Sequence, residues 1–164
     1  MKIKIFTGGG TIDKIYSDQK GTLNFSFSDK QAVLELFESK LKLNFEYKVE
    51  RLLMKDSLEM NDEDRQLIKK ACESTIENKI LITHGTDTMI DTAKVLSTIP
   101  NKVIVLTGAS QPYQFRESDA EFNVGVAIGA LNVLNQGVYI CMNGRVYQWD
   151  KCEKRSDGIF MDKN

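Results

Sequence analysis

The sequence predicts an α/β protein: one three-layer sandwich domain built on a mostly parallel β-sheet. Short apolar runs rich in β-branched residues alternate with segments of helical periodicity, and this alternation is typical of parallel sheets. The chain has 164 residues, the usual size of a single domain with a substantial core. Hydrophobic residues make up 41% of the chain and charged residues 27%, which is an ordinary globular composition.

Five segments are expected to form strands. Four are short apolar runs with β-branched residues, at 3–6, 79–83, 102–107 and 137–142. The fifth alternates between apolar and polar positions through Phe45, Tyr47 and Val49. Because helical segments separate most of these strands, neighbouring strands are expected to be parallel.

Helices are predicted between the strands from apolar residues spaced three and four apart, at 29–41, 61–77, 88–97 and 119–135. Ser28 with Gln31 forms a possible capping box before the first of them. The run 61–64, Asn-Asp-Glu-Asp, places hydrogen-bond acceptors and negative charge at the start of the second. The expected architecture is therefore flavodoxin-like, with helices on both faces of the sheet.

Two segments are expected to lie outside this framework. Residues 11–27 combine turn formers at 18–21 with a short apolar alternation at 23–27, which predicts a mobile hairpin that could act as a lid. Residues 156–164 are predicted to be a short polar tail. No repeat or linker divides the chain, so residues 1–164 are expected to form one domain.

Charge and cysteine content narrow the class of protein. The formal net charge of −1 gives no electrostatic reason to expect binding to nucleic acid. Cys72, Cys141 and Cys152 are an odd number without metal-ligand or C-x-x-C spacing, so we expect reduced thiols and a cytoplasmic location. The N-terminus reaches a glycine-rich turn too early for a signal sequence, and no apolar run approaches the ~20 residues of a membrane span.

Two threonines each follow a glycine directly after a predicted strand: Thr11 after Gly8-Gly9-Gly10, and Thr86 after His84-Gly85. The carboxyl ends of parallel strands are the usual place for active sites in α/β proteins. We therefore expect the two hydroxyls to meet in one small cavity. A hydroxyl nucleophile needs a proton acceptor, and the only histidine, a lysine or a nearby tyrosine could each serve.

Simpler explanations exist for the same residues. The glycine run does not match a nucleotide-binding loop, because Asp13 stands where G-x-G-x-x-G needs its third glycine, and the glycines could merely turn the chain. Thr86 or Asp87 could cap a helix, and His84 could be a hydrogen-bonded structural residue. One histidine and dispersed cysteines and carboxylates give no ligand set for a metal, so no metal site is expected.

Both turns resemble the signatures of the bacterial-type L-asparaginase family, a T-G-G-T-I turn after the first strand and a later H-G-T-D-T turn. The residues concerned are Gly9-Gly10-Thr11-Ile12 and His84-Gly85-Thr86-Asp87-Thr88. Three further stretches resemble the family in the same order. Residues 57–61 are similar to its S-x-D-M-N substrate loop, 106–112 to its L-T-G-A-x-x-P strand end, and 119–123 to its D-x-x-F-N helix start.

The resemblance implies a catalytic set. Thr11 corresponds to the acylated nucleophile, Thr86 to the second threonine, and Asp87 to the aspartate that binds the α-amino group of the substrate. Lys154 corresponds to the lysine that activates the second threonine, with Lys151 as the alternative. Tyr16 is the only tyrosine between the nucleophile and the first helix and corresponds to the tyrosine of the flexible loop.

The resemblance also implies substrate contacts. Ser57 corresponds to the residue that contacts the α-carboxylate of the substrate. The full implied set of binding residues is Gly10, Ser57, Glu59, Gly85, Thr86, Asp87 and Ala109.

The implied activity is hydrolysis of L-asparagine to L-aspartate and ammonia, without a cofactor, by a homodimer or homotetramer. The chain departs from the family in three ways: it ends where a smaller C-terminal domain would begin, Glu59 replaces an aspartate, and an extra glycine precedes Thr11. Two alternatives therefore stay open: an inactive or weakly active amino-acid-binding domain, and a subunit of a larger amidotransferase-like assembly. The choice between asparagine and glutamine, one methylene apart, is left undecided.

Overall fold

A six-stranded sheet forms the centre of the protein in the computed structural model, which describes residues 1–19, 22–39 and 41–163. The strand order is β4-β1-β5-β6-β7-β8, and all neighbours are parallel except β7 and β8. The strands are β1 (Lys2–Gly9), β4 (Glu46–Lys55), β5 (Lys79–Thr83), β6 (Val103–Thr107), β7 (Gly137–Met142) and β8 (Arg145–Gln148). The predicted α/β class and mainly parallel sheet are confirmed.

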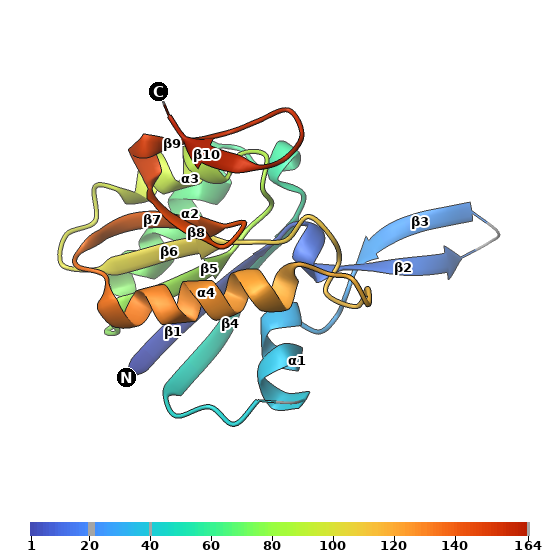
Figure 1. The fold of residues 1–164 in the computed structure, drawn as a ribbon, viewed down its shortest axis with the longest axis horizontal. Helices are drawn as coiled ribbons and strands as arrows, with labels where there is room; N and C mark the ends of the chain where they lie inside the picture. Colours follow the sequence, from blue (N-terminus) through green and yellow to red (C-terminus); the bar gives the residue numbers. More distant parts are fainter. Residues whose placement is uncertain (20–21, 40, 164) are drawn as a thin grey trace.

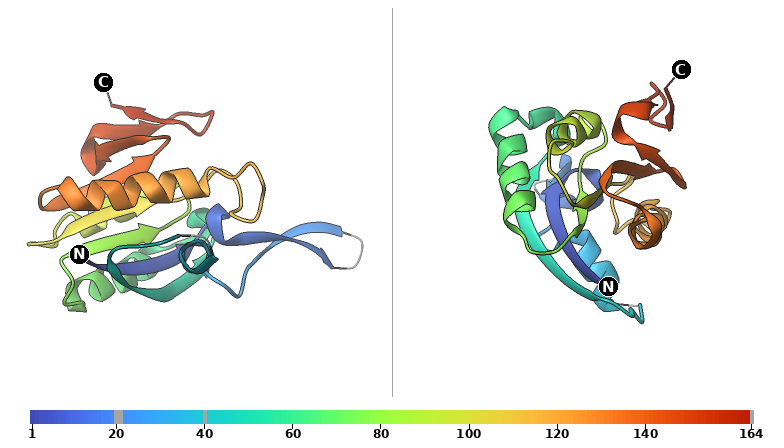
Figure 2. Two further views of the ribbon diagram at one scale, coloured as in Figure 1. Left: turned by 60° about the horizontal axis from the view of Figure 1, so that its bottom comes forward. Right: turned by 90° about the vertical axis from the view of Figure 1, so that its left-hand side faces the viewer.

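Helices cover both faces of the sheet (Figures 1 and 2). Helices α2 (Asp62–Ser74) and α3 (Met89–Leu96) bury one apolar cluster against it, with residues such as Ile82 and Leu106 of the strands. Helices α1 (Ala32–Ser39) and α4 (Ala120–Val133) bury a second cluster on the opposite face, with residues such as Ile5 and Val105. Alternate residues of each strand enter opposite clusters, so the central strands β5 and β6 are apolar nearly throughout.

The predicted helices are present, with different starts and ends. The acidic start of α2 is confirmed as a capping box: the Asn61 side chain accepts the Asp64 N–H, and the Asp64 carboxylate accepts the Asn61 N–H. The capping box expected at Ser28 and Gln31 is wrong, because α1 begins later, at Ala32. The N–H of Ala32 donates instead to the Asp13 carboxylate, 19 residues earlier in the chain.

The expected hairpin is present as the antiparallel pair β2 (Lys14–Gln19) and β3 (Thr22–Phe27), which projects away from the sheet (Figure 1). Its tip, residues 20–21, lies outside the described part of the chain. A lid function for residues 11–27 remains a proposal.

The predicted polar tail over 156–164 is wrong for residues 160–162. These residues form β10 (Phe160–Asp162), which pairs with β9 (Cys152–Lys154). The Phe160 side chain is buried in the apolar cluster on the face covered by α2 and α3. The Tyr147 hydroxyl donates to the Phe160 carbonyl at 2.8 Å. Pairing with β9, the hydrogen bond from Tyr147 and the buried Phe160 ring thus hold this segment against the core.

All three cysteines are buried and unpaired. Burial raises the pKa of the Cys72 and Cys141 thiols to about 12. Among the described helices, none combines the length and the apolar character needed to cross a bilayer.

Candidate active site

The two threonine-bearing turns lie side by side because β1 and β5 are adjacent parallel strands, paired in register toward their carboxyl ends. Gly10 packs directly on the backbone of Gly85: a Cβ atom at position 10 would lie 2.4 Å from the Gly85 nitrogen. Thr11 and Thr86 follow these glycines in the chain. The structure therefore brings the two predicted motifs together at one edge of the sheet.

The turn that carries Thr11 depends on Gly10 for its backbone conformation. Gly10 has a φ of 82°, which side chains disfavour, and its N–H donates to the Lys55 carbonyl at 2.9 Å. Thr11 then opens a short 3-10 turn, η1 (Thr11–Asp13), and is half-buried. Both the close approach to Gly85 and the positive φ exclude a side chain at this position.

Lys154 connects the second turn to the C-terminal part of the chain. Its Nζ lies 2.8 Å from Thr86 Oγ1 and 2.5 Å from an Asp87 carboxylate oxygen, within hydrogen-bond distance of both. The Lys154 side chain is only 20% exposed. Lys151, the alternative from the sequence, is 70% exposed and lies near the carboxylate of its neighbour Asp150. The geometry therefore brings Lys154, and not Lys151, to the second threonine.

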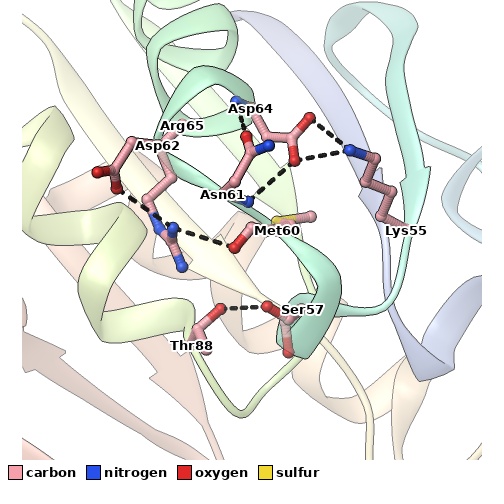
Figure 3. A network of polar contacts seen from close by, with 8 residues as sticks. All are labelled: Lys55, Ser57, Met60, Asn61, Asp62, Asp64, Arg65 and Thr88. Carbon is pink, nitrogen blue, oxygen red and sulfur yellow. Dashed lines mark hydrogen bonds and ion pairs between the residues drawn. The ribbon is translucent and has the colours of Figure 1, made fainter.

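The predicted substrate loop forms the 3-10 turn η2 (Ser57–Glu59), packed against Gly85. The Ser57 hydroxyl accepts the Asp87 N–H at 3.2 Å. The Ser57 carbonyl accepts the Thr88 hydroxyl at 2.7 Å, a contact drawn in Figure 3. Ser57 itself is buried, with 1% exposure, whereas Glu59 is exposed. These contacts hold the Asp87 backbone in place.

A polar network anchors η2 to the start of α2 (Figure 3). The Lys55 ammonium donates to both Asp64 carboxylate oxygens at 2.8 and 2.9 Å, and Arg65 Nη1 donates to the Met60 carbonyl at 3.2 Å. Burial acts to raise the pKa of Asp64, but Lys55 and the Asn61 N–H outweigh it and the pKa is lowered. The ionised Asp64 thus fixes both the helix cap and the strand that precedes the loop.

His84 is a structural residue in this arrangement. It is fully buried; Nδ1 lies 2.7 Å from the Gly85 carbonyl, and Nε2 lies 2.9 Å from the Thr92 hydroxyl. Because a carbonyl only accepts, Nδ1 carries the proton and Nε2 accepts from Thr92. Desolvation lowers the pKa of His84 to about 4. With both ring nitrogens engaged, His84 does not contact the hydroxyl of Thr11 or Thr86.

A third turn follows β6 and packs against the second. A Cβ atom on Gly108 would lie 2.3 Å from the His84 carbonyl oxygen, and the next residue, Ala109, is buried. The Asn123 side chain on α4 donates to the Gly108 carbonyl at 3.1 Å and accepts the Asn143 N–H at 3.1 Å. The sequence pattern did not predict that Asn123 would link these two turns. It marked Asn123 only as part of a helix start.

Tyr16 is not among the residues brought together here. It lies on β2, 47% exposed, with its ring edge-on to Phe25 at 6.1 Å between centroids. A cavity of about 670 Å³ lies nearby, between α1 and the loop before α4, and includes Tyr113 and Arg116 in its wall. None of the predicted site residues lines it. In the described part of the chain, no group of three or more His, Cys, Asp or Glu side chains could hold a metal ion.

The sequence profile of the family described as "Asparaginase, N-terminal" matches residues 2–158. The chain is similar to a Glutamyl-tRNA(Gln) amidotransferase subunit from Methanococcus maripaludis, with 30% identity over 147 residues that cover 87% of the chain and 35% of the relative. It is also similar to the Glutaminase-asparaginase of Acinetobacter glutaminasificans, with 33% identity over 103 residues, 60% of the chain and 30% of the relative.

Solved structures share the fold. L-asparaginase I from Vibrio cholerae superposes with a TM-score of 0.83 at 25% identity, and the thermostable L-asparaginase from Thermococcus kodakarensis with 0.85 at 24%. In both cases 99% of this chain covers 51% of the other. The chain thus spans about half the length of these structures and about a third of the length of the curated relatives. Since the profile match takes in almost the whole chain, the protein belongs to the asparaginase family, and its residues correspond to the N-terminal domain.

Proposed function

We propose that this protein is an amidohydrolase that converts L-asparagine to L-aspartate and ammonia, with Thr11 as the nucleophile. The observation that carries this proposal is the contact of Lys154 with both Thr86 and Asp87, on a turn whose glycine packs against the glycine before Thr11. A lysine, two hydroxyls and a carboxylate at one sheet edge are the groups that an amino-acid amide needs for binding and attack.

In the proposed reaction, the Thr11 oxygen attacks the side-chain carbonyl carbon of asparagine, and the amide C–N bond breaks after the nitrogen takes up a proton. Ammonia leaves and an ester to Thr11 remains. Water then hydrolyses that ester, releases aspartate and restores the threonine hydroxyl. Backbone N–H groups of the glycine-rich turns, including those at Gly85 and Ala109, are proposed to hold the developing oxyanion. The Gly10 N–H already donates to the Lys55 carbonyl, so Gly10 is proposed to contribute through its close packing against Gly85.

Lys154 is proposed to act as the base through Thr86, because its Nζ lies 2.8 Å from Thr86 Oγ1. Asp87 is proposed to bind the substrate's ammonium group, which would fix the amino acid's orientation. Burial of Ser57 favours a role in holding Asp87, and the exposed Glu59 beside it is proposed to face the substrate. Tyr16 is proposed to approach Thr11 when the hairpin closes.

A second candidate function is membership of a larger assembly. Its support is specific: several similar curated proteins are named as subunits of a Glutamyl-tRNA(Gln) amidotransferase, and the chain covers about a third of them. A third candidate is an amino-acid-binding domain without efficient turnover. We further propose cytoplasmic location and a homodimer or homotetramer, which would let a neighbouring copy close the site.

The purified chain separates these candidates in one assay series. Ammonia release is measured with L-asparagine, L-glutamine and no amide, beside the melting temperature with and without each amino acid. The enzyme proposal predicts release from L-asparagine by the chain alone. A melting shift without ammonia would support a binding domain, and ammonia only after addition of a co-purifying protein would support membership of an assembly.

A further inference from the structure

Asp13 joins the turn that carries Thr11 to the base of the hairpin and to helix α1. Its side chain is buried, with 5% exposure, and Oδ1 accepts the N–H of Ala32, the first residue of α1, at 2.8 Å. Its carbonyl accepts the Ser28 N–H at 2.8 Å, which ties the end of the hairpin to its beginning. Its own N–H donates to the Gly10 carbonyl at 3.2 Å. A single residue thus contacts the glycine turn, the hairpin and the helix.

Charged groups approach this carboxylate from the elements around it. Arg51 on β4 donates to the Ser28 carbonyl at 3.0 Å, and its positive charge acts on Asp13. Lys14 of β2, Lys30 before α1 and Glu35 of α1 line a very small cavity together with Asp13. Burial nevertheless dominates and raises the pKa of Asp13 to about 6, while the Ala32 N–H and Arg51 pull it down.

The position of Thr11 depends on these contacts because the turn η1 is only three residues long, with Thr11 at one end and Asp13 at the other. The first N–H groups of a helix need acceptors, and α1 obtains one from Asp13 in place of a residue directly before it. Loss of this acceptor releases the turn and the helix from each other. Displacements of about 1 Å in a nucleophile can cost about 100-fold in rate.

We propose that Asp13 is a positioning residue of the asparaginase-type reaction: by holding η1 against α1, it fixes both the Thr11 hydroxyl and the base of the hairpin. This inference rests on the proposed function for its catalytic part. Asp13 does not touch the substrate in this scheme, so it acts on kcat through the placement of Thr11 and leaves binding through Asp87 largely unchanged.

The test compares Asp13→Ala, which removes the acceptor, with Asp13→Asn, which keeps an oxygen for the Ala32 N–H without the charge. Asp29→Asn, at an exposed carboxylate a few residues before α1, is the matched control. We expect Asp13→Ala to lower kcat about 10- to 100-fold with KM within about threefold, and Asp13→Asn to recover most of that loss. Amide hydrogen exchange should become faster in 11–19 and 22–32 of Asp13→Ala only.

Folding is checked by circular dichroism, so that a misfolded Asp13→Ala is recognised. In that case Asp13→Asn carries the test against wild type and Asp29→Asn: kcat near wild type with unchanged exchange in 11–19 and 22–32 supports the acceptor role, and a loss of kcat of about 10-fold or more overturns it. A folded Asp13→Ala with wild-type kcat and wild-type exchange at the hairpin base would overturn the proposal. So would equal losses in both Asp13 variants. If the wild-type chain shows no turnover at all, the proposed function fails while the exchange measurement still decides whether Asp13 holds the turn.

Discussion

At the scale of single residues, burial shifts the pKa of His84 and of Asp13 in opposite directions. His84 and Asp13 both lie in surroundings with little water, and in both cases desolvation disfavours the charged form. For the histidine this lowers the pKa to about 4, and for the aspartate it raises the pKa to about 6. Around neutral pH the histidine is therefore neutral and hydrogen-bonded, and the aspartate is ionised at a cost in stability.

The neutral state of His84 can be tested without mutation, because the chain has only one histidine. We expect its ring resonances in an NMR titration to stay unchanged from pH 8 to about pH 5.5, since the folded-state pKa is near 4. The unfolded chain in urea serves as the control and should titrate near 6.5. A folded-state midpoint near 6.5 would contradict the hydrogen-bonding described for this ring.

Asp13 should make stability depend on pH in a defined direction. Its pKa is about 6 in the folded state against an ordinary value of 3.8, so the folded state binds the proton more tightly. The contribution of Asp13 to the free energy of unfolding is therefore largest below about pH 4. It falls by about 3 kcal/mol as pH rises through about 6. Asp13→Asn should therefore gain melting temperature relative to wild type at pH 8 and lose that advantage at pH 4.5. An advantage equal at both pH values would argue against a raised pKa.

At the scale of elements, the apolar periodicity of the chain predicted the five main strands and the four helices, because those elements bury regular apolar faces. The short strands β8, β9 and β10 have three or four residues each and few buried side chains, so they carry no such pattern. Lys154 lies on β9, and resemblance to the family, not periodicity, indicated it. No local signal marked Asp13 as the acceptor for α1, since its partner is 19 residues away.

Glycines within the elements differ in what they contribute. Gly129 lies inside α4, and a Cβ atom there would meet nothing within 4 Å, whereas at Gly108 it would lie 2.3 Å from the His84 carbonyl oxygen. We expect Gly129→Ala to raise the free energy of unfolding by up to about 1 kcal/mol through helix propensity. Gly108→Ala should lower it. Urea denaturation measures both, and a destabilising Gly129→Ala would show that this face of α4 is in contact with something.

The β9–β10 pair is expected to hold Lys154 in place, because Phe160 is its register partner and is buried. Phe160→Ala should cost about 3 to 5 kcal/mol of stability. The neighbouring Ile159, 45% exposed, gives the control Ile159→Ala, which should cost much less. Thermal denaturation compares the two variants, and equal effects would mean that β10 does not anchor the core.

At the scale of the whole molecule, the sheet ends in two edge strands, β4 and β8, whose outward backbone groups have no strand partner among the described residues. Such edges favour self-association. We expect sedimentation velocity at micromolar concentration to give at least twice the mass of one chain. A monomer that persists at the concentrations used in the ammonia assay would contradict the proposed homo-oligomer, and any activity would then belong to a single copy.

The central claim is that the turns after β1 and β5 form one catalytic site, and its most direct measurement is ammonia release from L-asparagine by four proteins: wild type, Thr11→Ala, Lys154→Met and Lys151→Met. We expect release by wild type and by Lys151→Met, and a loss of at least about 100-fold in the other two while circular dichroism shows them folded. Undiminished release by a folded Thr11→Ala, or by Lys154→Met, would contradict it.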